Sequence, residues 1–535
     1  QNWALILETL ICISWGTLLV FAILKKIEKQ DFTNTELTAL ALGGWPLPAL
    51  LISLPILILL PFLPAEIIFI LAATLITISS GLAVHSIWKE ITPGIISPII
   101  IFLILFFLRL GFITNLILPP YFDSAEHYRI ILSLLKTEWP TSSYYHLGYH
   151  SIIAALKTVT HADLSLAMLI FGQAILAAIP LPVYFFIRRA TDSNMAAFFG
   201  VTLAAFGWYM PAHAVNWGKY PALLSLLLIQ FTIGAVILKN RWLIALSIIA
   251  SVLVHTRAAI LFGILGAAWM LSNQVWNKRT LLLALAGTMI GTTILLMDQN
   301  QFLGPTFEPY LIWITLPVVL LSALAFQSFP QLIIFSSLAI LMSSAGIFIP
   351  ITSAVTLLDR PLVEMILFLP LSFLGGLGVS KLPKFAVPVL AAIVIIHAWM
   401  AYNFYPSDCC QLANRNDAAA LDWINKRLPA DAHIAIASAD LELNAFGAPM
   451  QSAGTDAGIW IAPLTQRTVL PLPYLTDFTA QSTHDLLCEQ QVTYIYMGSM
   501  PQSFNFIESK PEWYETVFVL ADAEIVQVTG CGAGY

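Results

Sequence analysis

Long apolar segments follow one another between residues 3 and 403, and they constrain the fold more than any other feature of this sequence. A helix needs about 20 apolar residues to cross a bilayer core of roughly 30 Å. About fourteen segments reach or approach this length, near residues 3–24, 38–61, 66–87, 94–114, 163–187, 195–212, 220–238, 241–254, 258–272, 280–297, 310–326, 331–350, 362–380 and 385–403. The two at 241–254 and 258–272 are short for full spans and are typical of a hairpin that enters only part of the bilayer.

The composition agrees with a polytopic helical membrane protein and divides the chain in two. Hydrophobic residues make up 59% of the 535 residues, and the mean hydropathy of +0.83 is far above that of an average soluble protein. The formal net charge is +4 over residues 1–404 and −10 over residues 405–535. We therefore expect a transmembrane domain over 1–404, of about 13–14 helices, and an acidic water-soluble domain over 405–535.

Basic residues indicate which side of the membrane each loop faces. If the N-terminus lies outside, twelve Lys and Arg residues of alternate loops all fall on the side that the positive-inside rule identifies as the cytoplasm. These residues are Lys25, Lys26, Lys29, Lys89, Arg188, Arg189, Lys239, Arg241, Lys278, Arg279, Lys381 and Lys384. The outer loop 115–162 and the C-terminal domain then lie outside a bacterial cytoplasmic membrane. Residues 3–24 show no signal-peptide cleavage pattern, so we expect a permanent span.

The outer loop 115–162 carries an unusual density of ionisable residues, which are costly near hydrocarbon and often mark functional sites. Its first pattern is Asp123-x-x-Glu126-His127, whose spacing places the three side chains on one helical face, where they could converge on a metal or on a substrate hydroxyl. The alternative is a capping box, in which Asp123 caps an amphipathic interfacial helix and Glu126 completes the box. The two interpretations are compatible, but the capping box leaves His127 unexplained.

The second pattern is His146-x-x-x-His150, which also places two side chains on one helical face. This spacing suits two ligands of a zinc-like ion, although no Glu follows the first His as in metalloproteases. The nearby Tyr144, Tyr145 and Tyr149 are typical of an interfacial aromatic belt. Hydrogen bonding to a polar head group is therefore the interpretation that we favour over metal binding.

Further polar residues fall on the same predicted side of the membrane. One polar pocket at the outer boundary would account for them, whereas the alternative is that they are scattered loop residues. His255 and Arg257 favour a pocket, because they lie at the tip of two short segments where an unpaired cation is expensive. The candidate substrate-binding residues are His146, His150, His213, Lys219, His255, Arg257, Asp359 and Arg360.

These residues carry a resemblance to a known family. A long outer loop with an early acidic residue, amphipathic helices in that loop, many further spans and a soluble C-terminal domain resemble the GT-C superfamily of integral membrane glycosyltransferases. The segments DSAEHYR, YHLGYHSIIAAL, MPAHAVNWGKYPAL, LVHTRAAILFG and LLDRPLVEMILFLPLSFLGGLG are similar to those of bacterial membrane proteins, common in Chloroflexi-like genomes, that are grouped with GT-C enzymes. The resemblance covers most of residues 95–530.

The resemblance implies roles for individual residues. The acidic residue of the first loop corresponds to Asp123, which would activate the acceptor or bind a divalent ion, with Glu126 or His127 beside it. Asp123, His146 and His150 are the candidate ligands of that ion. Arg257 and Arg360, with Lys219, would hold the phosphate of a polyprenyl-linked donor, since the Arg fork binds two oxygens at once.

The sequence also departs from the GT-C pattern in three ways. Asp123 is followed by Ser124 and not by a second acidic residue, and His213 and Asn216 stand where the next outer loop would carry one. Four spans, and not one, precede the long loop. These departures bear on metal dependence and on catalysis itself.

The resemblance therefore predicts transfer of a hexosyl or pentosyl group from a polyprenyl phosphate to an extracytoplasmic glycan, lipid or protein. The alternatives are a non-catalytic GT-C-like scaffold subunit of a membrane complex, or a transporter of lipid-linked saccharides. Transporters often contain internal repeats, and none is evident here. The sequence lacks phosphate-loop, nucleophile-elbow and haem-attachment motifs, and its acidic outer domain argues against nucleic-acid binding.

The C-terminal domain reads as a small mixed α/β unit. Residues 414–429 and 482–491 predict helices, 433–438 and 492–498 predict strands, and 516–528 predict a closing hairpin. Asp456 and Trp460 are candidates for acceptor contact, although a buried structural Trp is the more common role. Because adjacent cysteines pair poorly, we expect Cys409 or Cys410 to form a disulfide with Cys488 or Cys531, whereas Cys12 lies in the first span.

Overall fold

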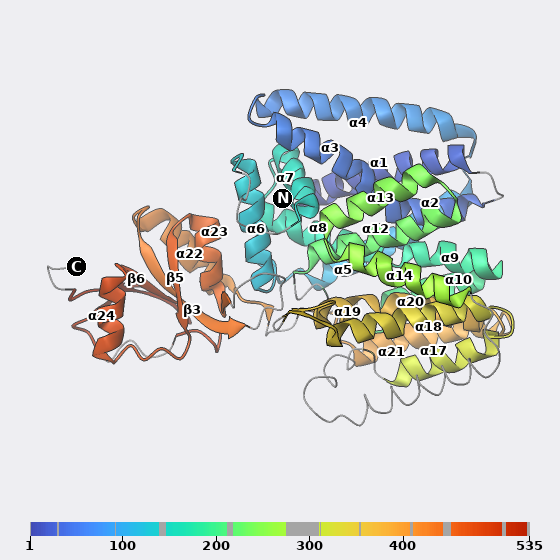
Figure 1. The fold of residues 1–535 in the computed structure, drawn as a ribbon. Helices are drawn as coiled ribbons and strands as arrows, with labels where there is room; N and C mark the ends of the chain where they lie inside the picture. Colours follow the sequence, from blue (N-terminus) through green and yellow to red (C-terminus); the bar gives the residue numbers. More distant parts are fainter. Residues whose placement is uncertain are drawn as a thin grey trace.

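The structure is a computed structural model of the chain. It describes all residues except 1, 29–31, 91, 139–145, 211–213, 215–217, 274–309, 311, 353–354, 407–409, 442–450, 505–509 and 532–535. A helical bundle forms the N-terminal part and a mixed sheet forms the C-terminal part, which lies at one end of the bundle (Figure 1).

Thirteen of the fourteen predicted apolar segments form helices, and the segment 280–297 falls outside the described residues. Within the described part of the chain, eight helical stretches are long and apolar enough to cross a membrane. They are α1 (Asn2–Ile27), α2 with α3 (Asn34–Gly44, Pro46–Leu59), α4 (Ala65–Ile87), α5 (Pro93–Phe112), α8 with α9 (Leu164–Ala178, Leu181–Thr191), α12 (Tyr220–Ile237), α18 with η4 (Pro330–Ala345, Gly346–Phe348) and α19 with α20 (Arg360–Ile366, Phe368–Val379). These helices make the chain a polytopic helical protein.

Five further apolar helices are shorter than a full span. They are α10 (Asn194–Phe206), α13 (Arg241–Val254), α14 (Ala258–Ser272), α17 (Ile312–Ala325) and α21 (Ala386–Ala401). α13 and α14 match the short hairpin predicted at 241–272. Two helices, α6 (Phe122–Leu135) and α7 (Gly148–Thr160), and the short η1 (Trp88–Glu90), β1 (Pro350–Thr352) and β2 (Val355–Thr356) complete this part.

Loops that are distant in sequence meet at the ends of the bundle. The Arg189 guanidinium lies 4.6 Å from the Phe32 ring, and the Lys381 ammonium lies 4.8 Å from the Phe329 ring. At the other end, the Tyr121 amide donates to the Cys410 carbonyl over 2.9 Å. Figure 1 shows the α9–α10 connection at the end opposite the sheet.

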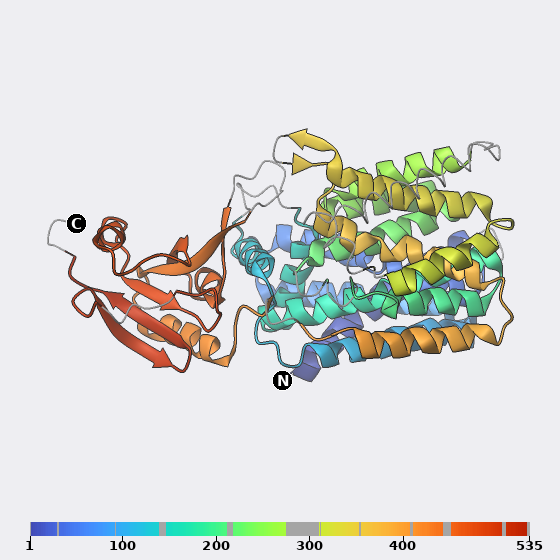
Figure 2. The same cartoon turned by 90° about the horizontal axis from the view of Figure 1, so that it is seen from below.

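The C-terminal part is a six-stranded sheet with helices on both faces (Figure 2). Strands β3 (His433–Leu441), β4 (Gln451–Gly454), β6 (Tyr494–Met497), β7 (Tyr514–Leu520) and β8 (Ala523–Val528) lie in the order β4-β3-β6-β8-β7, and β5 (Thr468–Pro473) pairs with β3 in parallel. The helices are α22 (Arg415–Arg427), η6 (Ala457–Trp460), α23 (Ile461–Thr465) and α24 (Gln481–Glu489). The predicted helices, strands and hairpin are confirmed.

Side chains of β3 alternate between the two faces of this sheet, as the strand period requires. Ile434 and Ile436 pack with α22 and Trp460, whereas Ala435 and Ala437 pack with Leu487 of α24. The first of these cores also contains Ala125 of α6. The sheet is therefore anchored to the bundle through α6.

The predicted disulfide pairing is wrong. Cys488 pairs with Cys531, because α24 and the chain after β8 are neighbours. Cys410 instead lies buried at the junction with the bundle, where its carbonyl accepts the Tyr121 amide, and Cys409 falls outside the described residues.

Candidate functional site

The site is built around the first turn of α6. Tyr121 precedes this helix with a φ of 66°, a left-handed conformation that is uncommon outside glycine. The predicted capping box does not form, because Tyr121 occupies the N-cap position and makes no side-chain cap. Asp123 lies inside the first turn, so its carboxylate is available for another partner.

That partner is Lys219, whose ammonium forms an ion pair with the Asp123 carboxylate across 96 positions of sequence. The Asp123 side chain is only 8% exposed and that of Lys219 only 24%. Gly218 makes the approach possible: its φ is +59°, and a β-carbon there would lie 2.2 Å from the Ser124 hydroxyl. The Asp123 carboxylate therefore has a cation as its partner within a mostly buried site.

One helical turn further, His127 meets a second histidine. Its Nδ1 lies 3.0 Å from Nε2 of His150 on α7, and both rings are buried. Nδ1 of His150 lies 3.1 Å from the His146 carbonyl, so this Nδ1 is the donor and its Nε2 accepts from His127. Because α7 begins at Gly148, His146 lies outside this helix. The prediction that His146 and His150 share one helical face is therefore wrong.

Burial keeps these imidazoles neutral. It lowers the pKa of His127 to about 3, aided by the charge of Lys219 and by His146. It lowers the pKa of His146 to about 4, aided by Arg257, and it lowers the pKa of His150 well below the usual range. The site thus holds neutral rings, which can donate and accept hydrogen bonds, beside charged groups.

The site continues from His146 to the C-terminal end of α13 and the N-terminal ends of α14 and α19. The rings of His146 and His255 lie 4.5 Å apart, and Arg257 forms a 2.5 Å ion pair with Asp359. His255 also lies near enough to Lys219 and His127 to interact with them electrostatically. We call Asp123, His127, His146, His150, Lys219, His255, Arg257 and Asp359 the outer polar cluster, after the side of the membrane on which the sequence predicts them.

Some predicted site residues lie apart from this cluster. Glu126 points to solvent, where Arg129 holds it at 2.6 and 2.8 Å, so it does not join Asp123 and His127. Arg360 pairs with Glu364 on its own helix at 2.8 Å. His213 and Asn216 fall outside the described residues.

A metal ion finds no complete set of ligands in the outer polar cluster among the described residues. Asp123, His146 and His150 point to different partners: Lys219, His255 and His127, respectively. The described residues bring three metal-ligating side chains close together at His484, Cys488 and Cys531, which lie in the sheet domain.

Two tyrosines belong to the site although sequence patterns did not single them out as ligands. Tyr149 and Tyr220 are both fully buried, with stacked rings 5.7 Å apart, and the Tyr149 ring lies 6.0 Å from His127. The Tyr149 hydroxyl has no hydrogen-bond partner among the described residues. Tyrosine at a membrane interface is so common that only the three-dimensional contact distinguishes these two.

The residues predicted to contact an acceptor in the sheet domain are buried. The Asp456 carboxylate accepts hydrogen bonds from the Gly458 and Gly498 amides at 2.8 and 3.2 Å and from the Ser503 hydroxyl at 2.5 Å. Trp460 has no exposed surface and packs edge-on against Tyr128 of α6 at 5.6 Å. Both side chains are packed inside the protein, and Trp460 contributes to the contact between the sheet domain and α6.

No family model and no curated protein matches this chain. The chemistry of the outer polar cluster is therefore the guide to function. It offers one buried carboxylate, two cations and four histidines, contributed by segments that meet at one end of an apolar helical bundle.

Proposed function

We propose that this chain is a membrane glycosyltransferase that moves a sugar from a polyprenyl-phosphate donor to an acceptor hydroxyl outside the bacterial cytoplasmic membrane. The observation that carries the proposal is the buried Asp123–Lys219 ion pair beside the neutral His127–His150 pair. A carboxylate that is shielded from water and held at a fixed position is suited to receive the proton of a hydroxyl group.

In the proposed reaction, the acceptor oxygen forms a bond to the anomeric carbon while the bond from that carbon to the donor phosphate breaks. Asp123 takes the acceptor proton and becomes neutral. Lys219 then loses its partner's charge and is free to stabilise the leaving polyprenyl phosphate. One ion pair thus couples proton removal to stabilisation of the leaving group.

Arg257 would hold the donor phosphate in this reaction, with Asp359 orienting its guanidinium until the donor binds. The four histidines and Tyr149 would supply hydrogen bonds to sugar hydroxyls, since neutral imidazoles both donate and accept. The lipid tail would lie against the apolar outer surface of the bundle. In this proposal the shorter helices α10, α13, α14, α17 and α21 also lie in the membrane.

The proposal gives no essential role to a metal ion. A divalent ion would need Asp123 to leave Lys219, and the histidines to turn from one another. The charge that such an ion supplies in other transferases is supplied here by Lys219 and Arg257.

The experiment compares Asp123→Asn with Glu126→Gln in proteoliposomes that contain radiolabelled polyprenyl-phosphate hexose or pentose. Loss of the base is expected to lower product formation by about 10²–10⁴-fold. Glu126→Gln removes a carboxylate from the exposed side of the same helix and is expected to leave the rate unchanged.

Equal product formation by both variants would refute the role of Asp123. Transbilayer movement of the labelled donor without any transfer by the wild type would instead identify a transporter. Neither movement nor transfer, with a folded wild-type protein and each donor supplied, would favour a scaffold subunit.

A further inference from the structure

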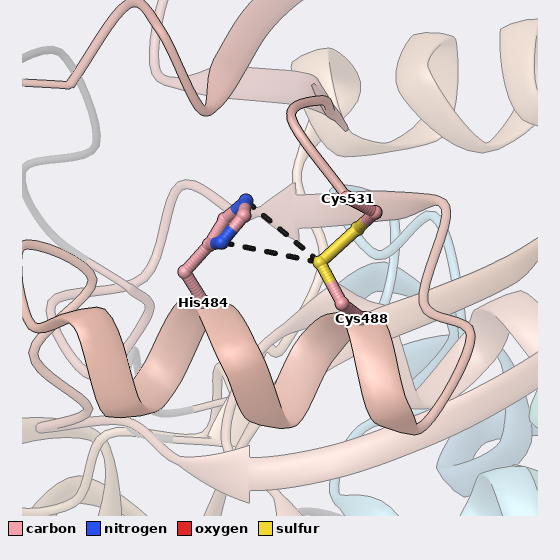
Figure 3. A group of neighbouring side chains, drawn as sticks. All are labelled: His484, Cys488 and Cys531. Carbon is pink, nitrogen blue, oxygen red and sulfur yellow. Dashed lines mark hydrogen bonds between the residues drawn. A yellow bond between two sulfur atoms is a disulfide. The ribbon is translucent and has the colours of Figure 1, made fainter. Parts of the chain in front are cut away.

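The sheet domain contains a second group of chemically versatile side chains, far from the outer polar cluster. His484 and Cys488 lie one helical turn apart on α24, and Cys531 reaches Cys488 from the chain after β8 (Figure 3). One ligand atom from each of the three residues lies within 4.8 Å of the other two. Figure 1 shows α24 on the side of the sheet domain away from the bundle.

The orientation of His484 is fixed by its surroundings. Its Nε2 lies 2.7 Å from the Thr529 carbonyl, so this nitrogen carries the hydrogen and Nδ1 keeps its lone pair. Its ring stacks on Trp513 with centroids 4.8 Å apart. A backbone carbonyl that holds one ring nitrogen is the usual arrangement of a histidine that binds metal through the other nitrogen.

The distances suit a thiolate–imidazole metal site. Nδ1 and Nε2 of His484 lie 3.9 and 3.8 Å from the Cys488 sulfur, as drawn in Figure 3. Bonds of about 2.3 Å from zinc to sulfur and about 2.0 Å to nitrogen, at a tetrahedral angle, separate these ligand atoms by roughly 3.6 Å. For a metal ion to enter, the two sulfurs would have to move apart. Cys531 is exposed and lies after β8, outside any helix or strand.

We propose that reduction of the Cys488–Cys531 disulfide converts this group into a binding site for one thiophilic metal ion, held by His484, Cys488 and Cys531. While the disulfide is intact, neither sulfur is a thiolate and the site is closed to metal. The state of the disulfide therefore controls whether the sheet domain binds metal.

The reduction step requires a dithiol reductant. A thiolate of the reductant attacks the exposed Cys531 sulfur and releases Cys488 as a thiolate beside His484. The second thiol of the reductant then displaces Cys531 and is itself oxidised to a disulfide. Two electrons and two protons pass to the cysteines, and binding of a divalent ion releases the protons of the two thiols.

The site is independent of the proposed glycosyl transfer, because its ligands come from the sheet domain alone. Three protein ligands leave a fourth position for water or another donor, as in many exchangeable zinc sites. Two thiolates also make the site attractive to Cu⁺.

The experiment measures Zn²⁺ bound by the full-length protein in detergent, by competition with a chromogenic chelator, before and after treatment with a dithiol reductant that is then removed without oxygen. The reduced wild type is expected to bind one more Zn²⁺ per chain than the oxidised wild type. Co²⁺ used as a spectroscopic probe should then show thiolate-to-metal charge transfer. Cu⁺ is tested separately against a Cu⁺-specific chelator.

His484→Gln and Cys531→Ser are the test variants. Each is expected to weaken Zn²⁺ binding by the reduced protein by more than about 100-fold. Loss of a residue that only orients a metal ligand costs up to about 100-fold, and these variants remove a ligand itself. Cys12→Ser and Cys410→Ser retain all three ligands and are expected to bind like the reduced wild type.

His484→Gln keeps the disulfide, so its oxidised form provides a folded reference if Cys531→Ser does not fold. The proposal is overturned if the reduced wild type binds no more Zn²⁺ or Cu⁺ than the oxidised protein. It is also overturned if folded, reduced His484→Gln and Cys531→Ser bind these ions as tightly as the reduced wild type.

Discussion

The outer polar cluster and the sheet domain both bury aspartates, but they stabilise them in different ways. In the sheet domain, Asp417 accepts hydrogen bonds from the Tyr496 hydroxyl at 2.7 Å and from the amide and hydroxyl of Ser499 at 3.0 and 2.5 Å. In the cluster, the buried Asp123 and the partly exposed Asp359 each rely on one cation from a distant segment, and one Asp359 oxygen has no partner among the described residues. A carboxylate whose two oxygens accept several hydrogen bonds is suited to a structural role. A carboxylate with a single partner can exchange that partner for a ligand.

The largest predicted effect is an opposite response of the two regions to acid. His127 and His146 have native pKa values of about 3 and 4, below the usual 6.5, so the unfolded chain binds more protons and stability is lost as pH falls. Between pH 6.5 and 5, each such histidine costs about 2 kcal/mol. Burial instead raises the Asp456 pKa to about 6, so this group stabilises the fold as pH falls from 6 to 4.

Thermal unfolding of the detergent-solubilised protein, with limited proteolysis to report on each region, checks this contrast. His127→Gln should lose less stability on acidification than the wild type, and Asp456→Asn should lose the acid stabilisation of the sheet domain. If stability depended on pH identically in the wild type and both variants, the predicted opposite response of the two regions would be wrong.

The second effect comes from removing a carboxylate that accepts several hydrogen bonds. Asp417→Ala leaves several buried donors without an acceptor and disrupts the capping box that Asp417 forms with Asn414, so it should destabilise the sheet domain by about 3 kcal/mol or more. Urea-dependent proteolysis of this domain measures the loss. Asp422→Ala, which removes an exposed carboxylate paired with Lys426 on the same helix, should cost less than about 1 kcal/mol.

The third effect tests whether the Arg257–Asp359 ion pair contributes more to donor binding than to stability. Arg257→Ala should lower stability by only about 1–2 kcal/mol, because both partners of its ion pair keep nearly a fifth of their surface in solvent. It should nevertheless raise the donor concentration needed for half-maximal transfer by about tenfold or more, since a charge-assisted phosphate contact is lost. Arg129→Ala, which breaks the exposed pair with Glu126, is the matched control and should change neither quantity.

The smallest effect concerns the contact between the two regions. Tyr128→Ala removes the edge-on contact with Trp460 and should weaken docking of the sheet domain by about 1 kcal/mol. Faster proteolysis within residues 402–414 would report it. Tyr184→Ala, at the opposite end of the bundle, should leave this cleavage rate unchanged.

The sequence alone predicted the helices of the bundle and the elements of the sheet, because apolar length and strand alternation are local patterns. It also predicted that Asp123, Lys219, Arg257 and Asp359 lie on the same side of the membrane. It did not reveal that Lys219 pairs with Asp123 and Arg257 with Asp359, because such pairings join segments roughly a hundred residues apart. Local spacing was misleading for Glu126, which pairs with Arg129 at the exposed surface of α6.

The cysteine pairing failed for a related reason. Four cysteines in one domain allow three pairings, and only the fold places α24 beside the end of the chain. The same fold brings His484 into contact with the disulfide. Sequence spacing alone indicates that His484 lies near Cys488, one helical turn away, but not that it lies near Cys531.

Helix α6 faces two ways: Asp123 and His127 join the outer polar cluster, while Ala125 and Tyr128 pack into the sheet domain. A graft that replaces only residues after the last apolar helix would thus set a foreign sheet against a helix shaped for another. A graft that also replaces α6 would instead set a foreign helix against Lys219 and His150 of the bundle. A functional chimaera therefore has to match both faces of α6.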